Sequence, residues 1–123
     1  MIQEVEWIEI DVALAYHNRQ IAEHGGTEGL RDEGLLLSAL ARPQNLNALG
    51  EDVDLAALAA SYAFGIAENL PFLDGNKRTA LVVSVAFLNL NGFDFDEGPV
   101  ETYRQFYDLA QGVLSEEELA KWY

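Results

Sequence analysis

The residue types best suited to chemistry gather in one segment, 70–80, which reads Leu-Pro-Phe-Leu-Asp-Gly-Asn-Lys-Arg-Thr-Ala. The Asp-Gly pair at 74–75 is typical of a tight turn, and Asn76 is a good N-cap for a helix that begins at Lys77. Such a helix leaves its first N–H groups without intrahelical partners and carries partial positive charge at that end, which favours anions. Lys77 and Arg78 add a point charge and a planar guanidinium that suit phosphate oxygens. The segment therefore predicts a phosphate-binding loop.

Two further residues extend this prediction to a nucleotide and a metal ion. Gly75 lets the backbone approach a ligand closely, and Asp74 could hold Mg²⁺ against phosphates because hard oxygen ligands suit that ion. Taken alone, each element has a simpler explanation, since turns, caps and solvated cation pairs are common in proteins. Taken as one contiguous string, they predict a nucleotide polyphosphate site.

The rest of the pattern predicts a mainly α-helical protein whose helices position this loop. We expect Asp11 to cap the first helix, the glycines at 25–26 to end it, and Pro43 to end the second, followed by a polar connection over 43–54. The helix over 77–91, with Gly92 as its stop, is apolar around most of its surface and is expected to be the buried central one. The expected helices span 12–24, 33–41, 55–69, 77–91 and 100–110, with a last short helix capped by 115–118.

Two short segments, 5–10 and 93–97, show the alternation and β-branched or aromatic content of strands. They could pair in a small antiparallel ribbon, although two short strands alone would be marginal.

Size and composition predict a single folded domain over 1–123, because half of the residues are hydrophobic. The chain has no cysteine, which excludes disulfides and thiolate metal sites.

The formal net charge of -14 disfavours direct binding to nucleic acid or anionic membranes. The first residues lack the pattern of a secretory signal, and no apolar run is long enough to span a bilayer. We therefore expect a cytoplasmic protein whose anion site is at 77–78; the other basic residues are scattered singly, at Arg19, Arg31, Arg42, Arg104 and Lys121.

The segment 70–80 resembles the signature of the Fic/Doc superfamily, which reads His-Pro-Phe-x-Asp-Gly-Asn-Lys-Arg-Thr-Ala in its Doc (death-on-curing toxin) branch. It matches every specified position except the first, where Leu70 stands in place of His. Residues 21–44 also look like the Doc N-terminal region, so the resemblance covers most of the chain. Lys77 stands where the adenylylating Fic enzymes carry Gly, and Leu81 stands where they carry a second Arg. Both differences favour the Doc branch.

The resemblance implies a toxin of a type II toxin–antitoxin system. Doc-like toxins resemble kinases that transfer the γ-phosphate of ATP to a threonine of elongation factor Tu, which stops translation until a Phd-like antitoxin blocks them. Carried over to this chain, Lys77, Arg78 and the loop amides would cradle the phosphates. Asn76 would shape the loop and contact phosphate, and Asp74 would support Mg²⁺. The antitoxin would donate an amphipathic segment to a groove near the loop.

Leu70 stands where the family carries the His that accepts the proton of the target hydroxyl. Leucine has no titratable proton and cannot act as a general base, a role worth about 10²–10⁴ in rate. We therefore expect negligible transfer by this chain, whether Leu70 is a natural loss or a deliberate substitution. Nucleotide binding should survive, because phosphoryl transfer depends mainly on positioning and electrostatics. Two alternatives are a Fic-type adenylyltransferase and a noncatalytic protein that binds nucleotide or antitoxin.

Several other residues are expected to be structural. His17 lies within the first helix and is interpreted as a structural histidine, although the helix could bring it near the loop. His24 is expected at a helix end, and Glu68 is expected to point to solvent. Phe72 corresponds to the family's core anchor for the loop. The glycine-rich stretch 25–34 is interpreted as a connection between helices that could contribute to the rim of the site.

Overall fold

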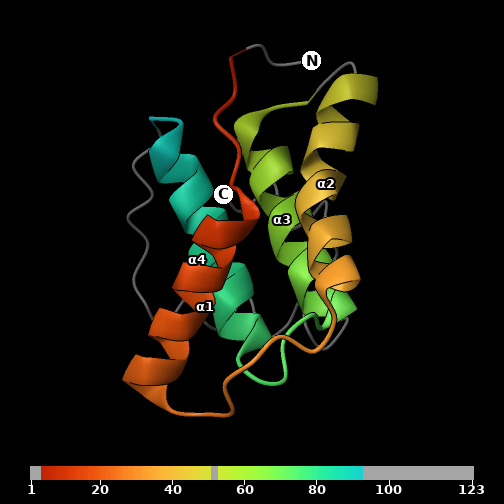
Figure 1. Cartoon of the computed structure of the whole chain (residues 1–123). Coiled ribbons are helices and arrows are strands. Elements are labelled where there is room, and N and C mark those ends of the chain that lie inside the picture. Colours follow the sequence, from red (N-terminus) through yellow and green to blue (C-terminus); the bar gives the residue numbers. More distant parts are fainter. Residues whose placement is uncertain (1–3, 51–52, 93–123) are drawn as a thin grey trace.

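The computed structural model describes residues 4–50 and 53–92, and within them the protein is a bundle of four helices (Figure 1). An isolated antiparallel bridge between Leu30 and Phe72 is the one β-type pairing in these residues. The mainly α-helical fold is thereby confirmed. The predicted strand over 93–97 and the predicted helices over 100–110 and after 115 lie outside the described residues. The helices are α1 (Ile10–His24), α2 (Glu33–Leu49), α3 (Leu55–Asn69) and α4 (Asn76–Leu90).

Helix α3 is the most deeply buried of the four, because it packs against α2 on one side and α4 on the other. Its range matches the prediction over 55–69. Helix α4, expected to be the buried central helix, has no exposed residue from Thr79 to Leu88, while residues 58–63 of α3 are buried without interruption. Small side chains let α3 lie close to α2. A Cβ on Gly65 would lie 3.3 Å from the Cα of Ala39, so α3 approaches the backbone of α2 too closely for a larger residue.

Helix α2 extends much further than predicted, because Pro43 lies inside the helix instead of ending it. The buried face of α2 continues through Pro43 to Asn47, with buried residues at helical spacing on both sides of the proline. Proline in a helix interior removes a hydrogen bond and costs about 3 kcal/mol. Packing of this continuous face against α3 outweighs that local preference, so the predicted polar connection from 43 is helical up to Leu49.

The predicted strand over 5–10 is also wrong. Residues 5–9 form no ladder, and α1 begins at Ile10 with Glu9 as its N-cap in place of the predicted Asp11. Side chains satisfy the backbone of this segment instead. The Asn91 side chain accepts from the N–H of Glu6 and donates to its carbonyl, each at 2.9 Å. The buried Tyr62 hydroxyl accepts from the N–H of Ile8 at 3.0 Å.

The end of α1 follows the prediction. Helix α1 stops at His24, and Gly25 adopts a positive φ of 79° while its N–H donates to the carbonyl of Ile21. Among the described residues, no helix combines the length and the apolar character needed to cross a bilayer.

Candidate functional site

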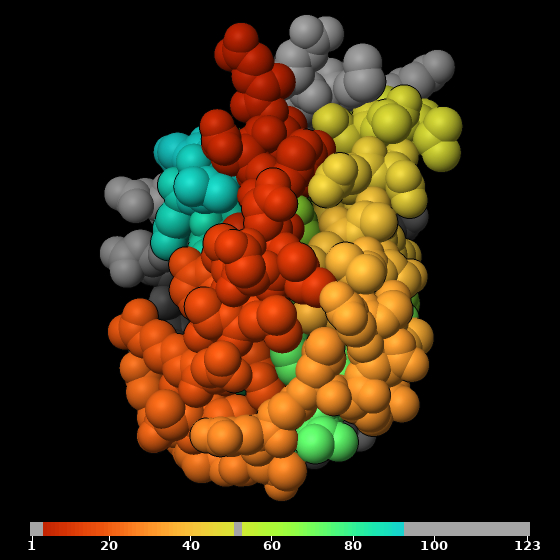
Figure 2. Space-filling view, in the orientation of Figure 1, coloured from red at the N-terminus to blue at the C-terminus, as the bar shows by residue number. Residues whose placement is uncertain are grey.

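The segment 70–75, here called the motif loop, connects α3 to α4 at the lower end of the molecule in Figure 1. It lies against the segment 25–32, here called the linker loop, which connects α1 to α2. The N–H of Leu73 donates to the carbonyl of Gly29 at 3.1 Å, next to the bridge between Leu30 and Phe72. Atoms of both loops reach the surface side by side at the lower end of the space-filling view (Figure 2). The two loops therefore form one structural unit.

Asp74 is held by two main-chain donors, one from each loop. Its Oδ2 accepts from the N–H of Thr27 at 3.1 Å, and its Oδ1 accepts from the N–H of Gly75 at 2.9 Å. These hydrogen bonds, with smaller contributions from the charges of Arg78 and His17, lower the pKa of the Asp74 carboxyl. The side chain is exposed. Asp74 is therefore an ionised, oriented carboxylate at the surface of the loop.

The sequence predicted Asn76 as the N-cap of α4, but Asn76 is the first residue of the helix. Gly75 occupies the N-cap position in the left-handed conformation, with φ 74°. The Asn76 side chain turns back to Phe72, where Oδ1 accepts from the N–H at 2.9 Å and Nδ2 donates to the carbonyl at 3.0 Å. No side chain caps α4, whereas Asp32 and Asp54 cap α2 and α3.

His17 joins α1 to the motif loop. Its side chain is buried, as expected for a structural histidine, and its Nε2 lies 2.8 Å from the carbonyl oxygen of Asp74. The imidazole also stacks on Phe72, which is itself buried, as expected for the anchor of the loop. The sequence left open whether His17 reaches the site; the structure brings it into direct contact with the loop. Helix α1 thus fixes the position of the turn at Asp74.

Lys77 and Arg78 occupy the first turn of α4, directly after the glycine N-cap. Arg78 is exposed and Lys77 is half-buried. The first N–H groups of a helix and the positive end of its dipole favour anions, and both cations stand at that end. The structure therefore gathers five predicted site residues, Asp74 to Arg78, into a single turn that suits a chain of phosphates.

Leu70 lies at the opposite end of the motif loop, as the C-cap of α3. It is one of two non-glycine residues with positive φ among those described, with φ 52° and ψ 54°. The left-handed conformation costs a residue with a Cβ about 1–2 kcal/mol. The Leu70 side chain is 47% exposed, so whatever side chain stands here is presented at the surface next to the loop.

Arg31 was not recognised from the sequence, where it is one of several isolated basic residues. Its Nε donates to the carbonyl of Leu70 at 2.7 Å, and its Nη2 donates to the carbonyl of Asn69 at 2.8 Å. No sequence signal marks this role, because the acceptors are main-chain atoms 38 and 39 residues further along the chain. Thr27 was missed for the same reason, since it contributes only its main-chain N–H.

The chemistry of the turn fits a metal that arrives together with phosphates. No group of three or more His, Cys, Asp or Glu side chains that could hold a metal occurs within 4–50 and 53–92. Mg²⁺ in nucleotide sites is commonly held by one or two carboxylates and by the phosphates themselves. Asp74, ionised and exposed, suits that role.

Comparison with known proteins agrees with this geometry. A sequence model described as the Fic/DOC family matches residues 7–88, a range that includes α1, α2, α3, the motif loop and most of α4. The chain belongs to the Fic/DOC family. It is 33% identical over 104 residues to "Protein kinase doc" of Escherichia phage P1, covering 85% of this chain and 79% of that protein. It is 42% identical over 78 residues to "Toxin Doc" of Mycolicibacterium smegmatis, covering 58% of this chain and 59% of that protein. Within the family, the chain is therefore Doc-like.

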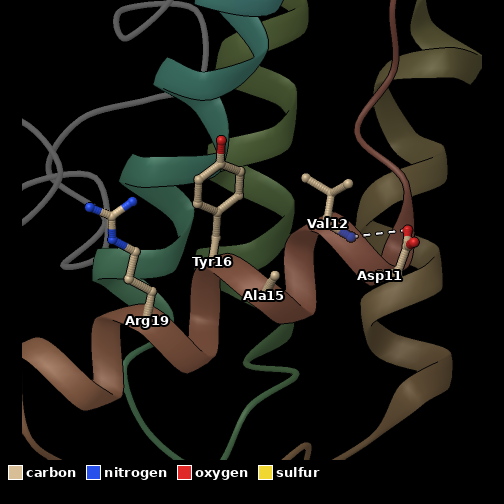
Figure 3. A pocket seen from close by; sticks show the side chains of 5 residues that line it. All are labelled: Asp11, Val12, Ala15, Tyr16 and Arg19. Atoms are coloured by element: carbon tan, nitrogen blue, oxygen red, sulfur yellow. Dashed lines mark hydrogen bonds between the residues drawn. The ribbon is translucent and has the colours of Figure 1, made fainter.

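A surface pocket of about 400 Å³ lies elsewhere on this Fic/DOC chain, along α1 (Figure 3). Val12, Tyr16 and Arg19 point to the same side of the helix in this view, and the carboxylate of Asp11 accepts from the N–H of Val12. The buried residues of α1 recur on the opposite face of the helix, which includes His17. The pocket is therefore separate from the motif loop. The residues that line it are Asp11, Val12, Ala15, Tyr16 and Arg19.

Proposed function

We propose that this Doc-like chain is the toxin of a type II toxin–antitoxin pair. Its relative from Escherichia phage P1 is named a protein kinase, and its relative from Mycolicibacterium smegmatis is named a toxin. The proposed activity of the family machinery is transfer of the γ-phosphate of ATP to a threonine of elongation factor Tu. It acts in the cytoplasm, where it stops translation, and a Phd-like antitoxin blocks it.

The observation that carries this proposal is the start of α4. This helix has a glycine N-cap and no side-chain cap, and two cations lie in its first turn. Main-chain N–H groups, the helix dipole and the two cations all favour a polyphosphate there. The net charge of -14 makes such a concentration of positive charge unusual on this chain and argues against nucleic acid as an alternative ligand.

We propose the following individual roles for these residues. Lys77 and Arg78 bind phosphate oxygens, and Asp74 supports Mg²⁺. Gly75 takes the left-handed conformation at the start of α4, and its missing Cβ lets the turn pack closely against Ile21 and His17 of α1. Asn76 shapes the loop, because both polar groups of its side chain bond to Phe72; a phosphate contact from Asn76 would come from its main-chain N–H. ATP·Mg²⁺ supplies the phosphoryl group, and these residues hold and orient it.

Leu70 occupies the position of the general base, and leucine can accept no proton. We propose that the chain as it stands binds ATP·Mg²⁺ but does not transfer phosphate. A general base contributes about 10²–10⁴ to rate, so transfer should fall to a small fraction of that of an active member. Because Leu70 is half-exposed at the rim of the loop, a polar imidazole would be accommodated there without disturbing the core.

Restoring the base tests the proposal. We expect Leu70→His to transfer label from [γ-³²P]ATP to elongation factor Tu and to arrest growth when it is expressed without antitoxin. Leu70→Gln, which is polar but cannot act as the base, is the matched control and should remain inactive. Label transferred from [α-³²P]ATP would instead indicate an adenylyltransferase. A folded Leu70→His protein that binds ATP·Mg²⁺ but transfers neither label would indicate a noncatalytic binding protein and would refute the kinase.

A further inference from the structure

We infer that Arg31 is a positioning residue for the side chain at position 70. Its guanidinium fixes the main chain of residue 70 in the left-handed conformation, and that conformation sets the direction in which the side chain leaves the backbone. The catalytic part of this inference rests on the proposed function, whereas the conformational part can be tested on the chain as it stands.

The contact is specific in its geometry. Nε and Nη2 of Arg31 donate to the carbonyls of Leu70 and Asn69 at 2.7 and 2.8 Å, so one planar group binds two consecutive carbonyls. These carbonyls belong to the C-terminal end of α3, where carbonyls lack intrahelical donors and the dipole is negative. A charged donor is the strongest kind of partner for such acceptors.

The conformation of residue 70 needs this support. Leu70 has a Cβ, which disfavours the left-handed region, and it precedes Pro71, which pushes the preceding residue towards extended conformations. The N–H of Leu70 continues the helical pattern by donating to the carbonyl of Ile66 at 3.2 Å. That bond holds only the amide group of Leu70 and not its carbonyl. Beyond it, the guanidinium of Arg31 holds the Leu70 carbonyl.

The backbone of Arg31 is fixed independently of its side chain. The main-chain N–H groups of Arg31 and Asp32 both donate to the carbonyl of Pro71, at 2.7 and 3.1 Å. The Asp32 side chain then caps α2 by accepting from the N–H of Leu35 at 3.0 Å. Replacing the Arg31 side chain should therefore remove the guanidinium contacts while the linker loop and the start of α2 stay in place.

A general base must lie within hydrogen-bond reach of the proton that it accepts. A change of residue 70 from the left-handed to the extended region would swing its Cα–Cβ bond away from its present direction relative to the turn at Asp74. Arg31 therefore acts on transfer through position 70 and not through nucleotide binding, which takes place at the start of α4.

The first test uses the chain with Leu70 and does not depend on activity. NMR chemical shifts of the Cα and Cβ of residue 70 and its HN–Hα coupling report whether φ is positive. We expect Arg31→Gln to lose the left-handed signature and Arg31→Lys, which can reach the carbonyls with a single ammonium, to retain it in part. The matched control is Arg19→Gln, which removes an exposed arginine that pairs with Glu23 on α1. Unchanged shifts at residue 70 in Arg31→Gln would overturn the inference.

The second test uses the Leu70→His background. Adding Arg31→Gln should lower kcat about 10- to 100-fold, in keeping with the effect of small misplacements. The KM for ATP should stay within about twofold, because binding at α4 is unaffected. Arg31→Lys should rescue part of kcat, and Arg19→Gln should change neither constant. Full kcat in Leu70→His/Arg31→Gln would overturn the inference about Arg31 and leave the kinase proposal intact. An inactive Leu70→His protein would refute the kinase, and the NMR result alone would then decide the role of Arg31.

Discussion

The imidazole of His17 lies flat on the ring of Phe72, with 3.8 Å between the ring centroids and 4° between the ring planes. The Nε2 of the same ring lies 2.8 Å from the carbonyl oxygen of Asp74, so this nitrogen carries the proton that the carbonyl accepts. One buried side chain of α1 therefore contacts the middle of the motif loop and also the residue at which it turns. The loop is fixed to α1 in a way that helix packing alone would not achieve.

Variants of His17 should separate these two contacts. His17→Phe keeps an aromatic ring against Phe72 but removes the donor to Asp74, and we expect it to lower the free energy of unfolding by about 1 kcal/mol. His17→Ala loses both contacts and leaves a cavity, so it should cost about 3 kcal/mol. Urea denaturation followed by circular dichroism gives both values.

The control for this series is His24→Gln, which changes an exposed histidine at the end of α1. It should alter stability by less than about 0.5 kcal/mol. Equal stability of His17→Phe and the unaltered chain would show that the bond to Asp74 does not stabilise the loop.

The lowered pKa of Asp74 predicts an acid-dependent contribution to stability. The hydrogen bond from the Thr27 amide is the largest cause, followed by that from Gly75. Because the folded pKa lies below the ordinary value of 3.8, this contribution is fully present above that pH and is lost as the pH falls below it through the folded pKa. The stability difference between the unaltered chain and Asp74→Asn should therefore be constant near neutral pH and change only below about pH 4. A difference that stays constant down to pH 2.5 would contradict the assignment.

Gly75 should be sensitive to substitution in both stability and binding. Gly75→Ala places a Cβ at a positive φ and 3.2 Å from Cδ1 of Ile21, which should cost about 1–2 kcal/mol. Gly25→Ala is the matched variant, because Gly25 has a similar φ of 79° and no atom within 4 Å of the added Cβ. Thermal unfolding should show a loss for both, larger for Gly75→Ala. In calorimetric titration with ATP·Mg²⁺, only Gly75→Ala should bind more weakly.

Arg78 should contribute to nucleotide affinity even if, as we propose, the chain with Leu70 does not transfer phosphate. Arg78→Gln removes a charged donor at the start of α4, and we expect the Kd for ATP·Mg²⁺ to rise about tenfold, equivalent to about 1.4 kcal/mol. Affinity should also become less dependent on salt than in the unaltered chain. Arg19→Gln, on α1, serves as the control. Identical affinities for Arg78→Gln and the unaltered chain would place the nucleotide elsewhere.

Much of the helical fold could be predicted from the sequence, because two of its helices are marked by strong local signals. The apolar run over 55–69 gave α3 with correct bounds, and the glycine at 25 gave the end of α1. Pro43 misled the prediction because its local preference is outweighed by packing against α3, which no local pattern reveals. The strand expected over 5–10 failed because Tyr62 and Asn91, which bind its backbone, are far away in the sequence.

The residues of the candidate site also fall into those that the sequence could predict and those that it could not. Asp74 to Arg78 are contiguous, so their proximity was certain once the turn was recognised, and the exposure of Glu68 also followed the prediction. The role of Asn76 was misjudged, because its side chain binds Phe72 instead of capping the helix. Arg31 and Thr27 meet the loop through hydrogen bonds in which one partner is a main-chain atom, and His17 meets it through such a bond and through its stacking on Phe72. None of these contacts joins residues that are close in the sequence, so only a three-dimensional structure could reveal them.

The carbonyls of Asn69 to Phe72 and of Asp74 all accept hydrogen bonds from side chains or amides within the protein. The loop thus gives up its conformational freedom during folding and not during recognition. A ligand would meet a receptor of fixed shape, and association would carry little entropic penalty from ordering the polypeptide. The backbone of the motif loop should consequently have the same conformation in the free and the ligand-bound protein.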